Sequence, residues 1–138
     1  MKKNELDLSS LKNSYNTLSE CYKDYIAEKN DKIKTYIKDS CIKRFEYTYE
    51  TAKKIMNKYL KKEYDKDEKE LTINNIFRDM YGLGFIKDFE RWTEYRLKRN
   101  TTSHEYDIEK TYVLMDIIPN FIKDTEFLIN ELEKTLED

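Results

Sequence analysis

Apolar residues in the first 64 positions follow two helical stripes that are separated by a short polar segment. In the first stripe, apolar residues recur at alternating spacings of three and four. Its members are Leu8, Leu11, Tyr15, Leu18, Tyr22 and either Tyr25 or Ile26. The second stripe consists of Ile33, Ile37, Cys41, Phe45, Thr48, Ala52, Ile55 and Tyr59. Each pattern is typical of a helix with one buried face, so we predict helices over about residues 8–28 and 32–63.

A polar run, "KKEYDKDEKE", follows the second helix and is predicted to be a solvated connection. Thr72 is then placed to cap a short third helix, because its hydroxyl can accept a hydrogen bond from a backbone amide of the first turn. Gly82 or Gly84 is expected to end this helix in the left-handed conformation.

Two further helices complete the predicted chain. The fourth runs from Asp88 to about Thr102, and its spacing places Phe89, Trp92, Arg96 and Arg99 on one side. Asp107 is expected to cap the final helix, in which Pro119 should cause a kink or a short break. The predicted inward residues of this helix are Ile108, Tyr112, Met115, Ile118, Ile122, Ile129 and Leu132.

These elements predict an all-α fold, namely an antiparallel four-helix bundle with an additional short connecting helix. The composition agrees, since the chain has only 2 glycines and 1 proline, with 39% charged and 38% hydrophobic residues. A chain of 138 residues is long enough for one core, so residues 1–138 are predicted to form a single domain.

Charge and cysteine content limit the classes of ligand that this chain can bind. The net charge of -2 excludes a broad electrostatic footprint for nucleic acid, so any such contact must be local. Residues 1–64 carry 15 basic and 10 acidic side chains, whereas residues 105–138 carry 3 and 10. One histidine and two cysteines, Cys21 and Cys41, cannot form a tetrahedral metal site within one chain. No metal and no cofactor are predicted.

The N-terminal sequence "MKKNELDL" has acidic residues too early for a signal peptide, and no long apolar run follows it. We therefore expect a cytoplasmic protein that has no membrane span. Free thiols fit that location, and each cysteine lies in an apolar stripe where it behaves as a small hydrophobic residue.

The stretch "RNTTSHEY", Arg99 to Tyr106, contains the only histidine, His104. Its polar residues suit a loop that ends a helix, and Arg99 would then be a cation near the helix C-terminus. The same stretch also suits phosphate chemistry, because an imidazole that titrates near neutral pH lies close to a permanent cation and a phenol. Asn100 and Ser103 either orient these groups or cap the helix.

Three segments of the chain resemble the substrate-binding partner proteins of minimal nucleotidyltransferases, which belong to the HEPN superfamily and include the HepT toxins. The segments are "RFEYTYETAKK" (44–54), "GLGFIKDFERW" (82–92) and "RNTTSHEYDIEKTY" (99–112). The resemblance spans nearly the whole chain and includes the R-x4-H-x-Y pattern. The chain departs from it at Lys53, where relatives often have an aromatic residue.

This resemblance implies a homodimer in which two R-x4-H motifs share a cleft, together with a minimal nucleotidyltransferase as partner. It implies one of two activities, either a metal-independent endoribonuclease toxin or a non-catalytic subunit that binds a nucleotide or another substrate. In the toxin systems the partner adds AMP to the motif tyrosine, which here is Tyr106. Tyr106 alternatively packs into the core.

RNA cleavage without a metal needs a base for the 2′-hydroxyl proton and a cation for the charge on the phosphate oxygens. His104 and Arg99 supply these groups. One histidine per chain does not readily serve as both acid and base, so a two-fold dimer with a second His104 would complete the site.

Overall fold

The computed structural model describes residues 6–102 and 108–136. Within these ranges every regular element is a helix, which confirms the predicted all-α fold. The helices are α1 (Ser9–Ala27), α2 (Asp31–Tyr64), α3 (Ile73–Gly82), α4 (Phe89–Thr102) and α5 (Ile108–Thr135). Each of the first four begins and ends within about two residues of the predicted bounds, because the apolar periodicity and the caps are both strong.

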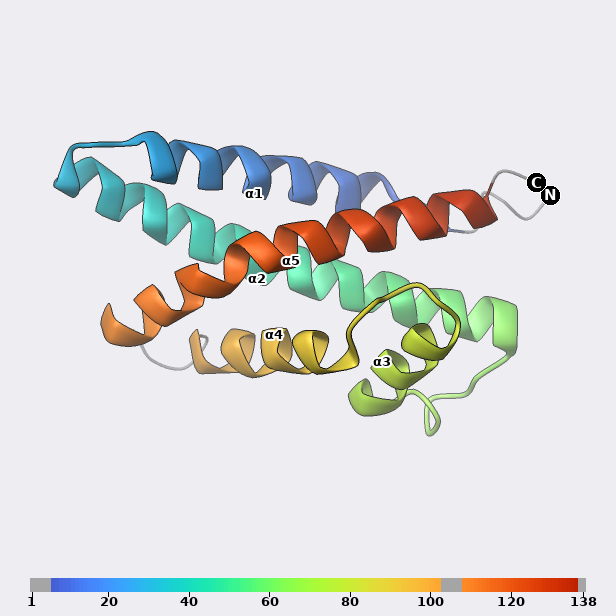
Figure 1. Ribbon diagram of the computed structural model, residues 1–138. Coiled ribbons are helices and arrows are strands. Elements are labelled where there is room, and N and C mark those ends of the chain that lie inside the picture. Colours follow the sequence, from blue (N-terminus) through green and yellow to red (C-terminus); the bar gives the residue numbers. More distant parts are fainter. Residues whose placement is uncertain (1–5, 103–107, 137–138) are drawn as a thin grey trace.

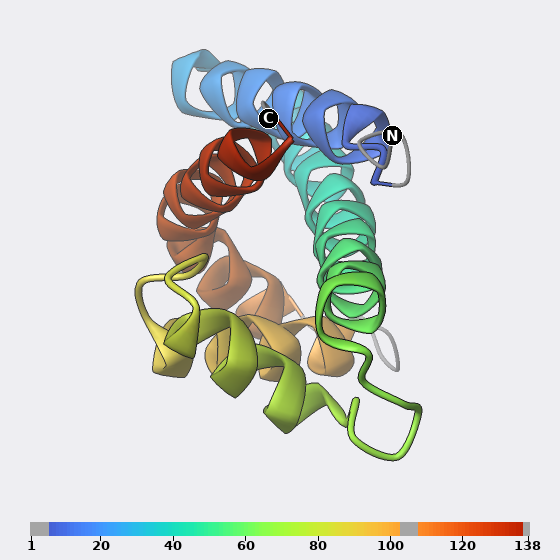
Figure 2. The same ribbon diagram turned by 90° about the vertical axis from the view of Figure 1, so that its right-hand side faces the viewer.

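The long helix α2 organises the bundle, since it packs against each of the other four helices. It pairs with α1 in an antiparallel hairpin, and α5 packs against both of them. Viewed from one end, α1 and α3 lie on opposite sides of the molecule, with α2 and α5 between them (Figure 2). The short helix α3 therefore covers only the C-terminal part of α2 and the adjoining helix α4.

Side-chain caps fix several helix starts. The Thr72 hydroxyl accepts a hydrogen bond from the Asn75 amide at 3.3 Å, which confirms the predicted cap of α3. Asp88 plays the same part at the start of α4, where its carboxylate accepts from the Arg91 amide at 3.0 Å. Of the two candidate terminators, Gly84 adopts the left-handed conformation at φ 88°, whereas Gly82 is the last residue of α3.

Pro119 lies inside α5, which remains one continuous helix. The predicted short break is therefore wrong. The helix axis does bend along its length (Figure 1). Proline cannot donate a hydrogen bond to the carbonyl four residues earlier, and a bend accommodates its ring without ending the helix.

An aromatic cluster forms the centre of the core, where α2, α4 and α5 meet. The Phe121 ring centroid lies 4.8 Å from that of Phe45 and 5.0 Å from that of Tyr95, both in edge-to-face geometry. Trp92 contacts Tyr95 at 5.3 Å and is fully buried. Truncating one such aromatic side chain to alanine costs about 3–5 kcal/mol, so this cluster fixes α4 against α2 and α5.

Most predicted inward residues of α1 and α2 are buried, with exceptions near the turn that joins them. Tyr25 rather than Ile26 packs against the core, and Ile26 is 59% exposed. The predicted burial of Ile33 is wrong, because this side chain is 45% exposed. The two cysteines meet across the same hairpin, where their free thiols lie with sulfurs 3.1 Å apart.

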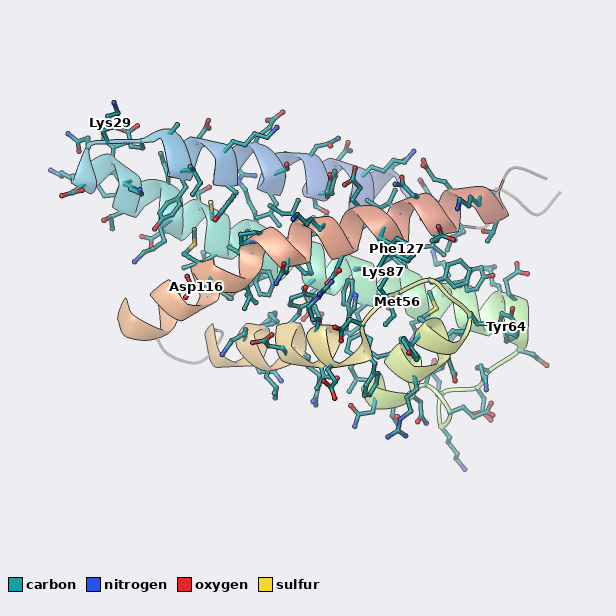
Figure 3. All side chains as sticks on the ribbon, viewed as in Figure 1. Lys29, Met56, Tyr64, Lys87, Asp116 and Phe127 are labelled. Atoms are coloured by element: carbon teal, nitrogen blue, oxygen red, sulfur yellow. The ribbon has the colours of Figure 1, made fainter. Side chains whose placement is uncertain are left out.

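The connection between α3 and α4 is held against α5. The Lys87 ammonium lies 4.8 Å from the centre of the Phe127 ring, a cation–π contact whose two residues are labelled in Figure 3. None of the described helices has the length and apolar character that would be needed to cross a membrane.

Candidate functional site

Arg99 is the motif residue whose side chain the structure places. It lies near the C-terminal end of α4, and its side chain is 24% exposed. Its Nε lies 3.1 Å from Oε2 of Glu50, which projects from the middle of α2. Asn100 follows on the same helix and is exposed. The other predicted site residues, Ser103, His104 and Tyr106, lie outside the described residues, as does the predicted cap Asp107.

Glu50 is shared between two cations. Its Oε1 lies 3.2 Å from the Lys53 ammonium, one turn further along α2, while its Oε2 faces Arg99. Because these groups are partly exposed, each pair contributes on the order of 1 kcal/mol or less to stability. The consequence for the site is positional, since Glu50 determines where the Arg99 guanidinium lies relative to α2.

Tyr49 lies beside these charges and is almost completely buried, at 2% exposure. Its hydroxyl has no hydrogen-bond partner among the described residues. Burial raises the pKa of this phenol above its usual range and Glu50 acts in the same direction, whereas Arg96 and Arg99 oppose the rise. The Tyr49 hydroxyl therefore keeps its proton at neutral pH, and it lies within electrostatic reach of both guanidiniums.

A buried carboxylate behind the site ties α4 to α5. Asp124 of α5 accepts two hydrogen bonds from the Arg91 guanidinium, from Nε at 2.8 Å and from Nη2 at 2.6 Å. It also accepts a hydrogen bond from the Tyr95 hydroxyl. A forked guanidinium–carboxylate pair fixes both distance and orientation, so it sets the position of the helix that carries Arg99.

Lysine side chains continue from Glu50 toward the C-terminal end of α2. They line a groove between α2 and the start of α3, with a volume of about 550 Å³. The lining residues are Lys53, Lys54, Asn57, Lys58, Lys61, Leu71, Ile73 and Ile76. Lys53 connects the groove with the Arg99–Glu50 pair, because it lines the groove and also pairs with Glu50 on the same helix, α2.

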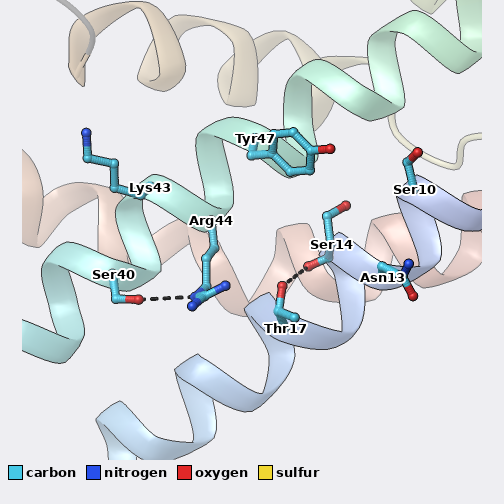
Figure 4. Close-up of a pocket in the computed structure, with 8 residues that line it drawn as sticks. All are labelled: Ser10, Asn13, Ser14, Thr17, Ser40, Lys43, Arg44 and Tyr47. Atoms are coloured by element: carbon cyan, nitrogen blue, oxygen red, sulfur yellow. Dashed lines mark hydrogen bonds between the residues drawn. The ribbon is translucent and has the colours of Figure 1, made fainter.

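A second pocket, of about 580 Å³, lies between α1 and α2 (Figure 4). It is lined by Ser10, Asn13, Ser14, Thr17, Ser40, Lys43, Arg44 and Tyr47. Arg44, a residue of the "RFEYT" segment, lines this pocket and donates from Nε to the Ser40 hydroxyl at 3.1 Å. Arg44 is thus oriented toward α1.

Arg99 was predicted from its motif, whereas Glu50, Tyr49 and Asp124 were not predicted. Glu50 and Tyr49 come from a different helix than Arg99, and only the register between α2 and α4 brings them together. Asp124 did carry a signal, because it is a carboxylate on the apolar side of α5, between Phe121 and Leu128. A charge in such a position requires a partner, which here is Arg91.

Comparison with known proteins places this geometry in a family. The model of the family described as nucleotidyltransferase substrate binding protein like matches residues 6–134. A Haemophilus influenzae protein named probable ribonuclease HepT is 33% identical over 95 residues, which are 67% of this chain. The match spans 65% of that protein, slightly less than two thirds of its length.

Two solved structures have the same fold. One, from Haemophilus influenzae, is described as the fold of a substrate binding domain of a nucleotidyltransferase. It is similar to this chain with a TM-score of 0.81 and 25% identity, over 92% of this chain and 99% of that one. The other, from Thermus thermophilus, has a TM-score of 0.74 and 18% identity over 93% and 99% of the two chains. Because the family model covers nearly the whole chain and the fold agrees, this protein belongs to the nucleotidyltransferase substrate-binding family and is HepT-like.

Proposed function

We propose that this protein is a metal-independent endoribonuclease of the HepT type, which acts as the toxin of a two-component pair with a minimal nucleotidyltransferase. The observation that carries this proposal is the fixed position of Arg99, at the end of α4 and against Glu50, five residues before His104. The similarity to a probable ribonuclease HepT supports the same activity. A cytoplasmic location and a homodimer belong to the proposal.

In the proposed reaction His104 removes the proton from a ribose 2′-hydroxyl, and the 2′-oxygen attacks the adjacent phosphorus. The bond from phosphorus to the 5′-oxygen breaks, and the leaving oxygen takes a proton from the second His104 of the dimer. The products are a 2′,3′-cyclic phosphate and a 5′-hydroxyl. Arg99 offsets the negative charge that gathers on the phosphate oxygens, which is where fixed charge lowers the barrier most. Asn100 and Ser103 would support the two groups.

The pairing with Glu50 suits this task. A guanidinium whose position is already fixed loses less conformational entropy when a phosphate binds than a lysine on a flexible stem does. An arriving phosphate would share Arg99 with Glu50 or replace Glu50 as its partner. In either case the cation is in place before the substrate arrives.

The test uses purified protein and single-stranded RNA in the presence of EDTA. We expect cleavage in EDTA, and we expect Arg99→Ala and His104→Ala each to lower the rate at least a hundredfold while circular dichroism stays unchanged. Arg44→Ala is the matched control, since this arginine lines the pocket between α1 and α2 and should leave the rate unchanged. Loss of cleavage in EDTA, or activity in both motif variants, would contradict the proposal.

A second candidate is a non-catalytic subunit that binds a nucleotide or another substrate for the nucleotidyltransferase. It is favoured by the description of the solved Haemophilus influenzae relative as a substrate binding domain of a nucleotidyltransferase. The same experiment separates the two candidates, because this subunit would bind nucleotide and leave the RNA intact.

A further inference from the structure

The groove between α2 and α3 concentrates positive charge in a protein whose net charge is -2. Helix α2 carries ten basic and five acidic residues, and four of its lysines line this groove. None of the eight lining residues is a carboxylate. The net charge of -2 allows only a local contact with a polyanion, and this groove is a local concentration of positive charge.

Two of the four lysines form ion pairs with acidic residues, whereas Lys58 has only a longer-range interaction with Asp7 and Lys54 forms no ion pair with a described residue. Lys53 pairs with Glu50, and Lys61 pairs with Glu68 from the connection after α2. Lys54 and Lys58 make no ion pair with a described residue, and both are exposed. Lys54 and Lys58 lie one helical turn apart, about 6 Å along the axis, so they present two charges in a row.

The opposite wall of the groove is apolar and includes the start of α3. Leu71 and Ile76 are buried at 7% and 3% exposure, and Ile73 is the first residue of α3. The unpaired amides of a helix N-terminus add partial positive charge at this wall. The lysines and this helix N-terminus together suit a ligand with repeating phosphates.

We propose that this groove binds the sugar–phosphate backbone of single-stranded RNA, with Lys54 and Lys58 as the principal phosphate contacts. The distance along α2 from Glu50 to Lys61 is about 16 Å, which is the length of a few nucleotides. A strand in the groove would continue past Lys53 to Arg99, so the groove would guide RNA to the proposed site of cleavage. The choice of RNA rests on the proposed ribonuclease function.

Binding is measured with a fluorescent single-stranded RNA that carries 2′-O-methyl groups, which cannot be cleaved by attack of the 2′-oxygen. We expect Lys54→Gln combined with Lys58→Gln to weaken binding at least tenfold at low salt. The slope of log Kd against log salt concentration should fall by about 1.4, since each lost phosphate contact on a single strand contributes about 0.7. The control is Lys29→Gln with Lys32→Gln, which should change binding less than twofold. Lys29 is an exposed lysine of the connection before α2 (Figure 3), and Lys32 is exposed in the first turn of α2.

The outcomes for the groove and for the catalytic proposal are distinguishable. Equal losses in the groove variant and the control, or none in either, would overturn the groove proposal whether or not the protein cleaves RNA. Groove-dependent binding without cleavage of unmodified RNA would support the groove and contradict the ribonuclease function. Polyglutamate of equal charge that competes as well as RNA would overturn the proposed occupant, because it would indicate an acidic protein segment instead.

Discussion

The carboxylate of Glu50 pairs with Arg99 in the absence of substrate. It lies 3.1 Å from the Arg99 Nε and 3.2 Å from the Lys53 ammonium, so one acidic group restrains a cation of the motif and a cation of the lysine groove. The buried Tyr49 hydroxyl lies beside this arrangement and keeps its proton, because burial raises its pKa. The described part of the site thus provides cations, and in the proposed reaction His104 is the base.

The sequence indicates the motif residues because they are close together in the chain, and their role as a site stays a prediction. Arg99 and His104 are separated by four residues, so their proximity follows from the chain itself. Arg99 and Glu50 are 49 positions apart. Their contact depends on the register between α4 and α2, which the packing of the aromatic core sets. Periodicity determines the face of a helix that is buried but not this register.

Tyr106 is the residue at which we expect regulation. Incubation with the cognate nucleotidyltransferase, ATP and magnesium should attach AMP to the Tyr106 hydroxyl and stop RNA cleavage. The added phosphodiester is anionic and would lie seven residues from Arg99, where it would compete with the RNA phosphate for that cation. Peptide mass spectrometry locates the modification, and the rate of RNA cleavage reports its effect.

The matched control for this experiment is Tyr47, a described tyrosine that is 59% exposed on α2. Tyr106→Phe should prevent labelling, whereas Tyr47→Phe should leave it intact. Labelling that persists in the Tyr106→Phe variant would assign the modification to another residue. Unmodified Tyr106 after complete incubation would favour the alternative that this side chain belongs to the core.

Among the elements, α4 is the one whose position matters most for the site, because it carries Arg99 near its C-terminal end. Its N-terminal end is capped by Asp88, its first turn packs against α5 through Trp92, and Arg91 binds Asp124 of α5. Asp124 is 5% exposed and accepts from both Arg91 and Tyr95. Loss of these contacts would change the orientation of α4 and therefore the position of Arg99.

We predict that Asp124→Ala lowers the free energy of unfolding by about 3–5 kcal/mol, the range for breaking a buried pair, or somewhat less because Arg91 reaches solvent. Tyr95→Phe removes one hydrogen bond to the same carboxylate and should cost about 1 kcal/mol. Urea unfolding measures both values. The exposed pair Lys134–Glu131 is the control, and Glu131→Ala should cost less than about 1 kcal/mol. Equal losses for Asp124→Ala and Glu131→Ala would show that Asp124 does not hold α4.

The helices themselves were predictable because each has a continuous stripe or a recognisable cap. The errors occur where a neighbouring element decides the outcome. Ile33 lies just after the α1–α2 turn and is exposed, since periodicity does not show where packing against other helices stops. α5 remains one continuous helix although it contains Pro119, because a long helix held by packing on both sides of a proline can remain continuous.

For the molecule as a whole, the distribution of charge matters more than its sum. Ten basic and five acidic residues lie on α2, whereas the final helix carries three basic and six acidic residues. A nucleic acid would therefore approach the α2 side of the bundle and avoid α5. Arg99 lies against α2, so the proposed cleavage site is on the side where electrostatic attraction is strongest.

The last prediction concerns the proposed dimer, since one histidine per chain does not readily serve as both acid and base. If both copies of His104 act in one cleft, a mixed dimer of wild-type and His104→Ala chains is inactive. Random mixing of equal amounts would then leave only about one quarter of the dimers active, following the pairing statistics of a two-fold assembly. Co-refolded chains at several ratios should show activity that falls with the square of the wild-type fraction, and sedimentation should confirm dimers.

Mixing with the Lys29→Gln variant, which should not affect the cleft, controls for the refolding step. Activity proportional to the wild-type fraction would show that each chain carries a complete site, and a monomer at tens of micromolar would exclude the shared cleft.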